Sequence, residues 1–544
     1  MENVLFVCMN TVQDLLDITH LVCSTRGKLP QANICVLTLK EHASLVKKVK
    51  GLNRIFQVDR KRISKIHRVQ SISNVFAVNY WFGVIKEVRE IAWDLVYVAN
   101  KDICGQLVAS SLNAKKIAGS YYLNSSMIPA YSCSWGMLST LKDEEIAPSV
   151  FNLIELQHKI AAMEFCVGED LKINLDLESN KNACEQLVAY RQSIRRDKRN
   201  SKLVAVDLNK FTEENDVFSK KSVCELLKKL INNELFHPIL LISGSDDEKD
   251  FVNYLNKQCN YPLLTICANL LNVSSVLINV EILVTGDVLA VKMADILNVP
   301  VVMISDDANN VYDNGGVNSG SIMIAPIVEK CAGDIVASGV VVAEDVLFAI
   351  YDIAHEIQLS EQTKVSADVA VYRTEVDATG IWYRPIAGEI NIHNEISKMF
   401  TRYFLIKIID GVSNNAIMEH ITREFDKREI HSWVDSEKEL LMYLANLLIE
   451  TIKSLRNIGK GKNNLFVSNL QMLLDGGKSS KLLSSLHHIL KLQLESIPND
   501  RSLGENIKGV DVILHEYKQK LQILVSSLTE LSYSEYKKRN EVSL

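Results

Sequence analysis

Proline occupies only nine of the 544 positions, and several features that would reveal a function at once are missing. No run reaches the roughly 18 apolar residues that a membrane-spanning helix needs, and the opening residues do not resemble a secretion signal. The eleven cysteines include no CxxC pair and follow no regular spacing, which is typical of reduced thiols. We therefore expect a cytoplasmic protein.

Motifs for common cofactors and metals are also absent. No G-x-G-x-x-G follows the first predicted strand and no G-x-x-x-x-G-K-[ST] occurs, which argues against a nicotinamide enzyme and a phosphate-loop NTPase. There is no H-E-x-x-H, no Cys–His cluster at zinc spacing and no G-x-S-x-G. His487 and His488 are adjacent, so on a helix they diverge by about 100° and cannot share a metal. We expect neither a metal nor a cofactor.

The charge balance gives no sign of a nucleic-acid partner. A formal net charge of −6 and a pI near 6.1 argue against general binding to a phosphate backbone. Hydrophobic residues make up 47% of the chain, as in a well-packed protein, and its length predicts roughly three domains.

Strand-like and helical stretches alternate twice along the chain, which predicts two doubly wound parallel sheets. A polar, basic passage at 191–202 separates the two regions. One long sheet is the alternative, but an open sheet of more than about ten strands is uncommon. The first region has strand candidates at 4–9, 33–39, 54–59, 94–100 and 115–123, and the second at 203–208, 237–243, 263–267, 281–285, 299–305 and 320–326.

The composition changes after about residue 360. A mixed stretch, which includes Trp382, Tyr383 and Arg384, precedes segments whose apolar residues recur at three-and-four spacing, as in amphipathic helices. We therefore expect three domains: a Rossmann-like domain at 1–195, a second at 196–358, and a mainly helical extension at 359–544. The extension is interpreted as a packing or oligomerisation bundle. Its mixed stretch is either a hydrophobic anchor or part of an acceptor site.

The segment "ILVTGDVLAVKMADILNVPVVMIS" (282–305) predicts a strand, a tight turn, a helix and a strand. In such units the turn before the helix is where ligands bind, because the helix N-terminus offers free N–H groups and a positive dipole end. The turn "TGDV" is therefore a candidate ligand site.

These segments resemble the family 9 glycosyltransferases, which include the lipopolysaccharide heptosyltransferases. The opening "VLFVCMNTVQD" resembles the strand and R-x-S-x-x-G-D loop with which that family begins, and 282–305 resembles its T-N-D-[ST]-G-x-x-H-x-A-A motif. The resemblance covers roughly residues 1–358. It implies the GT-B fold, an α/β architecture of two Rossmann-like domains facing a cleft, to which this chain adds its helical extension.

The resemblance also implies roles for individual residues. Asp14 falls on the aspartate thought to act as general base, with Asn10 and Thr11 as acceptor or loop contacts. Each has a structural alternative, since a first-turn aspartate also suits the helix dipole and polar residues suit a turn. The donor diphosphate would lie against Thr285, Gly286, Asp287 and Lys292, with Lys220 and Lys221 nearby. Each lysine could equally be an exposed helix residue.

Several family positions are altered: Cys8, Gln13, Leu289 and Lys292 replace arginine, glycine, glycine and histidine. The resemblance implies a glycosyltransferase in lipopolysaccharide or glycan biosynthesis. It would move a sugar, with heptose from ADP-heptose as one candidate, by an inverting, metal-independent mechanism to a glycan, lipid-linked glycan or protein. The alternative is an inactive GT-B scaffold that acts through its extension, where homo-oligomer contacts are also expected. Peripheral association with the inner membrane stays open.

Overall fold

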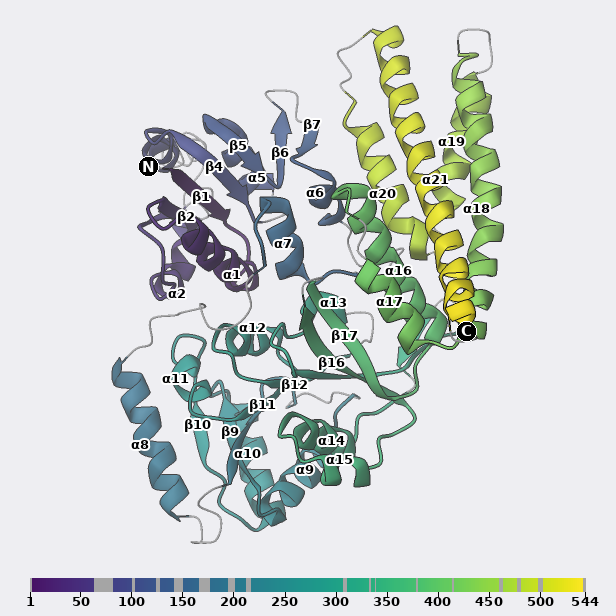
Figure 1. Ribbon diagram of the computed structural model, residues 1–544. Coiled ribbons are helices and arrows are strands. Elements are labelled where there is room, and N and C mark those ends of the chain that lie inside the picture. The colour runs from purple at the N-terminus through teal and green to yellow at the C-terminus, as the bar shows by residue number, and fades with distance from the viewer. Residues whose placement is uncertain are drawn as a thin grey trace. The chain divides into compact units, whose positions relative to one another are not determined.

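The computed structural model describes residues 2–62, 82–99, 103–123, 128–140, 150–165, 177–193, 201–211, 217–306, 311–331, 334–337, 339–377, 380–412, 415–458, 463–476, 481–497 and 502–541 (Figure 1). Most of the basic passage predicted at 191–202 lies outside these residues. The chain divides into two compact units. The first comprises Met1–Ile117 and Asn152–Ile390, and the second comprises Ala118–Phe151 and Asn391–Leu544.

The first sheet of the first unit has the strand order β3-β2-β1-β4-β5. β1 pairs in parallel with both β2 and β4, so the strand order reverses between β1 and β4. β1 and β2 are buried along almost their whole length, as expected for apolar strands of a parallel sheet covered on both faces. The elements are β1 (Asn3–Cys8), α1 (Val12–Lys28), β2 (Asn33–Leu39), η1 (Lys40–His42), α2 (Ala43–Val46), β3 (Arg54–Val58), β4 (Trp93–Val98), α5 (Ile103–Ser111) and β5 (Ala114–Ala118).

The second sheet has eight strands in the order β10-β9-β8-β11-β12-β13-β16-β17. β8 pairs in parallel with β9 and β11, so the order of this sheet reverses between β8 and β11. The two sheets are separate, as predicted, and do not form one long sheet. The parallel part of the second sheet and its helices are β8 (Lys202–Asp207), α9 (Lys220–Asn232), β9 (Phe236–Ile242), α10 (Asp246–Cys259), β10 (Thr265–Cys267), α11 (Val273–Leu277), β11 (Ile282–Thr285), α12 (Val288–Ile296), β12 (Val301–Ile304), α13 (Val311–Asn314) and β13 (Ile322–Pro326).

The second sheet continues past the boundary predicted at 358, which therefore needs correction. β16 (Val369–Asp377) pairs antiparallel with β13, and β17 (Gly380–Gly388) pairs antiparallel with β16. The hairpin is held there because β16 starts with buried apolar residues that join the core of the sheet. The other elements of this unit are α7 (Leu153–Ala161), α8 (Leu177–Ser193), β14 (Val328–Cys331), β15 (Asp334–Ala337), α14 (Ala343–Ile353) and α15 (Ile357–Gln362).

The strand predicted at 115–123 is divided in two. Gly119 has a φ of 108°, a left-handed conformation that glycine adopts readily, and it ends β5. The chain then forms β6 (Ser120–Leu123), which pairs antiparallel with β7 (Ile128–Tyr131). This hairpin belongs to the second unit.

The second unit is mainly helical, as the apolar spacing predicts. Its helices are α6 (Ser134–Leu138), α16 (Ile392–Ile409), α17 (Asn415–Glu424), α18 (Lys427–Leu455), α19 (Asn463–Gly476), α20 (Lys481–Glu495) and α21 (Leu503–Glu541). α18 packs against α19 and α21, and α16 packs against α20 (Figure 1). The Trp135 indole donates to Asp410 at 2.7 Å, which joins α6 to the end of α16. No helix in the described ranges is long and apolar enough to cross a membrane.

Candidate functional site

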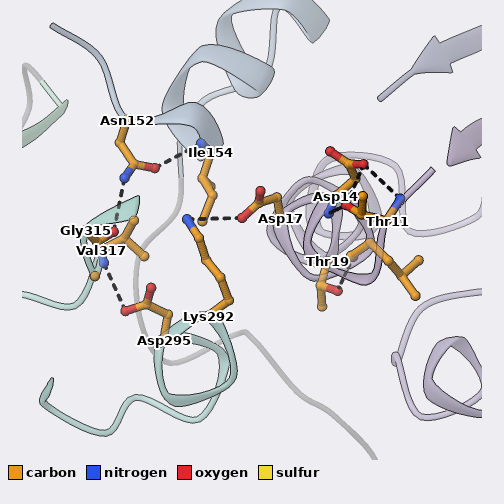
Figure 2. Close-up of polar contacts among 12 residues, drawn as sticks. Thr11, Asp14, Asp17, Thr19, Asn152, Ile154, Lys292, Asp295, Gly315 and Val317 are labelled. Carbon is orange, nitrogen blue, oxygen red and sulfur yellow. Dashed lines mark hydrogen bonds and ion pairs between the residues drawn. The ribbon is translucent and has the colours of Figure 1, made fainter. Parts of the chain in front are cut away.

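The loop after β1 and the first turn of α1 carry the three predicted residues Asn10, Thr11 and Asp14. Thr11 is the N-cap of α1, and its hydroxyl accepts a hydrogen bond from the Asp14 backbone N–H at 3.1 Å. The Asp14 carboxylate in turn accepts from the Thr11 N–H at 3.1 Å and from the Thr11 hydroxyl at 2.7 Å (Figure 2). This capping box holds Asp14 near the carboxyl end of β1. Asn10, beside it, is exposed.

The turn between β11 and α12 is built around Asp287. Asp287 is the N-cap of α12, and its carboxylate accepts a hydrogen bond from the Leu289 N–H at 3.1 Å. Its own N–H donates to the Thr285 hydroxyl at 2.9 Å. Two of the predicted donor-binding residues, Thr285 and Asp287, are therefore in direct contact. Asp287 also caps the N-terminus of α12, which follows them.

Two residues that the sequence did not single out complete this turn. Asp207, the last residue of β8, accepts a hydrogen bond from the Thr285 hydroxyl at 2.7 Å. The Asn209 side chain donates to the Asp287 carboxylate at 3.1 Å. The polar "DLN" that directly follows the apolar strand "LVAV" is the signal that could have identified them. The carboxyl ends of β8 and β11 thus share one polar cluster.

Gly286 lies where two segments approach closely. A Cβ at this position would lie 3.2 Å from the Lys210 Cβ and 3.2 Å from the ring of Phe211. Such distances are tighter than ordinary van der Waals contacts, so a side chain here would push the β11–α12 turn away from the loop after β8. A glycine at this position therefore lets the two segments approach closely without a shift of the Lys210 or Phe211 side chain.

The carboxyl group of Asp207 is buried, and this burial raises its pKa to about 6. Hydrogen bonds from Thr285 and the backbone of Asn209 act in the opposite direction, and the negative charges of Asp287 and Glu248 raise the pKa further. This acid therefore titrates close to neutral pH, next to the turn that the sequence assigns to an anionic ligand.

Lys292 is not the exposed helix lysine that the sequence allowed. Only 1% of its surface is exposed, and its Nζ lies 3.1 Å from the Asp17 carboxylate of α1. Figure 2 shows the lysine side chain reaching from α12 to Asp17. Burial raises the pKa of Asp17, while the lysine charge lowers it. The predicted contact of Lys292 with a diphosphate stays a prediction.

The two other predicted lysines lie at the start of α9. Lys220 and Lys221 are exposed, and Ser219 caps the helix by accepting from the backbone N–H of Ser222. The Nζ of Lys220 lies 5.7 Å from the centre of the Phe251 ring, and Lys221 forms a 3.9 Å ion pair with Glu225. Both ammonium groups are accessible to an anion, and their role in donor binding is untested.

The mixed stretch after residue 360 provides an anchor. Trp382 and Tyr383 lie in β17 and are buried, with 5% and 1% of their surfaces exposed. The Tyr383 hydroxyl is hydrogen-bonded to the Asn152 side chain at 2.8 Å. This burial favours the interpretation as a hydrophobic anchor over a contact with an acceptor.

Within the described ranges, no group of three or more His, Cys, Asp or Glu side chains is placed to hold a metal ion.

Among the comparisons with known proteins, only the one with solved structures finds matches, and these identify the fold. No family model and no curated protein matches the sequence. The structure of a family 9 glycosyltransferase from Veillonella parvula aligns with a TM-score of 0.50 at 12% identity, covering 65% of this chain and 98% of the other. The aligned part of this chain has the fold of a family 9 glycosyltransferase. At so low an identity the likeness concerns the fold alone.

Two Escherichia coli structures align with lower scores. ADP-heptose lipopolysaccharide heptosyltransferase II matches at 13% identity with a TM-score of 0.42, covering 66% of this chain and 100% of that one. Heptosyltransferase WaaC with ADP matches at 14% identity with a TM-score of 0.39, covering 58% and 90%.

Proposed function

We propose that this protein is a glycosyltransferase that uses a nucleotide-diphosphate sugar, with ADP-heptose as the first candidate donor. The main support is the position of the two predicted loops. Each follows the strand at which its own sheet reverses order, β1 in the first sheet and β11 in the second. Ligands of open α/β sheets bind outside the carboxyl ends of the strands at such reversal points.

In the proposed reaction Asp14 is the general base. It takes the proton from an acceptor hydroxyl, whose oxygen attacks the anomeric carbon of the donor while the bond from that carbon to the diphosphate breaks. A single displacement of this kind inverts the anomeric centre. The N–H groups at the start of α12, together with Lys220 and Lys221, receive the negative charge of the leaving diphosphate without a metal. The acceptor is a glycan, a lipid-linked glycan or a protein.

Thermal unfolding with a panel of ligands tests the donor. The panel contains ADP-heptose, UDP-glucose, UDP-N-acetylglucosamine and GDP-mannose, with plain ADP and UDP for comparison. A ligand at 100 times its dissociation constant stabilises the folded state by about 2.7 kcal/mol. We expect one nucleotide sugar to raise the melting temperature and to be slowly hydrolysed or transferred, with no loss of turnover in EDTA.

A matched pair of variants tests the place of binding. Asp287→Ala removes the N-cap of α12 at the proposed donor turn, and Asp426→Ala removes an aspartate N-cap of the same kind from α18 in the second unit. Each should cost about 1 kcal/mol of stability. Only Asp287→Ala should also weaken the stabilisation by the nucleotide sugar. Equal stabilisation of both variants would place the donor elsewhere.

The second candidate function is a scaffold that retains the fold without catalysis. It is favoured by apolar side chains left exposed on two neighbouring helices of the second unit, among them Met442, Tyr443, Leu465, Val467 and Met472. A contiguous patch of such groups would be typical of a protein contact surface. If no member of the ligand panel raises the melting temperature, the scaffold is the better account.

A further inference from the structure

Two opposite charges are buried together where α1 packs against α12. Asp17 has 0% and Lys292 1% of its side-chain surface exposed, and the two groups are 3.1 Å apart. The distance is that of an ion pair, yet within the described ranges neither the Lys292 Nζ nor the Asp17 carboxylate has a hydrogen bond of good geometry. The attraction between the charges is therefore their main polar interaction.

The other titratable groups around this pair do not replace either charge. His20 lies on α1 three residues after Asp17, and burial lowers its pKa well below the usual value, which keeps it neutral. Asp295 lies on α12 three residues after Lys292, but its carboxylate accepts hydrogen bonds from the backbone of Val317 and Asn318. Asp17 is thus the carboxylate that directly faces the ammonium group.

Stability alone does not explain this arrangement. Removing two charges from water costs more than an imperfect ion pair usually returns, and an apolar pair of similar volume often stabilises a protein as well or better. A charged pair differs from an apolar one in its tolerance of displacement. If α1 slides along α12, two buried charges move apart and lose their attraction, whereas apolar side chains replace one van der Waals contact with another. The pair therefore fixes one relative position of the two helices.

We propose that Asp17 and Lys292 form a positioning pair, which fixes the second turn of α1 against the second turn of α12. Asp14 lies three residues before Asp17, and Asp287 lies five residues before Lys292. The pair thus links the helix that carries the proposed general base to the helix that carries the proposed diphosphate site. The consequence for catalysis rests on the proposed function, whereas the restraint on the helices does not.

Amide hydrogen exchange on the full chain without ligand tests the restraint. The apolar double variant Asp17→Leu/Lys292→Met should melt within about 2 °C of the wild type, because an apolar pair replaces the buried charges. Its amides at 15–22 and 291–296 should nevertheless exchange at least about 10-fold faster, because helices that are not held in one position against each other open locally more often. The swapped variant Asp17→Lys/Lys292→Asp should restore slower exchange. An apolar double variant that exchanges as slowly as the wild type would overturn the proposal.

A buried ion pair within a single helix provides the control. Glu395 and Lys398 of α16 are each 2% exposed and 2.8 Å apart, and they belong to the second unit. Glu395→Leu/Lys398→Met removes the same kinds of charge. It should leave exchange in α1 and α12 unchanged, so a general effect of burying apolar groups would be recognised.

Turnover tests the consequence for catalysis, with ADP-heptose as the first probe and hydrolysis or transfer as the reaction. The apolar double variant should lose about 100-fold in kcat, because small misplacements of reacting groups cost that much. Its Kd for the nucleotide sugar should change less than about 3-fold. A large rise in Kd in Lys292→Met with no change in Asp17→Asn would mean that the lysine holds the diphosphate itself, and would overturn the positioning role. If the wild type binds no nucleotide sugar, the proposed function fails, while the exchange result still decides the restraint.

Discussion

The Asp14 carboxylate accepts the hydrogen bonds of the capping box and is also the proposed general base. Substitutions can separate these two roles. Asp14→Asn keeps an oxygen that can accept the hydrogen bonds from Thr11 but removes the base. We expect turnover to fall by about 10²–10⁴-fold with little change in stability. Thr11→Ala makes the opposite change: it removes the N-cap at a cost of about 0.5–2 kcal/mol but keeps the Asp14 carboxylate as a base. Unchanged turnover in Asp14→Asn would exclude it as the base.

Asp207 should make stability depend on pH. Its pKa of about 6 in the folded protein exceeds the ordinary 3.8, so protonation favours folding. This contribution is fully present below pH 3.8 and is lost as the pH rises through 6. At about 1.36 kcal/mol per pKa unit, the loss is about 3 kcal/mol. Urea unfolding between pH 4 and 7 should show this slope in the difference between wild type and Asp207→Asn. Parallel profiles would mean that Asp207 is already ionised at pH 4.

At the residue scale the sequence could identify the turn but not its partners. Thr285 and Asp287 stand at a strand end before a helix, a pattern visible in the sequence. The hydrogen bond from Thr285 to Asp207 joins residues 78 positions apart, so it depends on which strands become neighbours. The burial of Lys292 likewise depends on the packing of α1 against α12.

The β16–β17 hairpin offers a test at the scale of elements. A Cβ on Gly388, at a φ of +85°, would lie 1.9 Å from the Val369 carbonyl oxygen of the paired strand. Gly320 has a similar φ of +87° but nothing within 4 Å of a Cβ. Gly320→Ala should therefore cost only the left-handed strain of about 1–2 kcal/mol. Gly388→Ala should cost clearly more in urea unfolding, because the strands must separate. Equal losses would show that the hairpin adjusts freely.

The boundaries of elements were predictable where local chemistry sets them. Ser245 forms a capping box with Glu248 at the start of α10, and the S-x-x-E pattern of residues 245–248 is typical of a helix N-terminus. The β16–β17 hairpin was not predicted, because its strands mix buried, half-buried and exposed residues instead of forming one apolar run. β17 even contains Pro385, which a strand tolerates at the edge of a sheet.

At the scale of the whole molecule, the two compact units are not continuous in sequence. Residues 118–151 lie between two parts of the first unit, yet they group with 391–544. Composition does not mark this arrangement, since it rests on contacts such as that of Trp135 with Asp410, 275 positions away. A division of the sequence into three consecutive domains cannot represent this arrangement, because residues 118–151 fall within the range predicted for the first domain yet group with the mainly helical unit.

Truncation tests this organisation. A chain that ends at 358 lacks β16 and β17, so it exposes the edge of β13 and removes Val369 and Val371 from the core of the second sheet. Because an unpaired, apolar edge strand promotes association, we expect this chain to aggregate. A chain that ends at 390 keeps the whole sheet and should unfold cooperatively. Its residues 118–151 have lost partners such as Asp410, so limited proteolysis with mass spectrometry should find the first cuts there. If the shorter chain were as stable as the longer one, the hairpin would not be part of the core of the sheet.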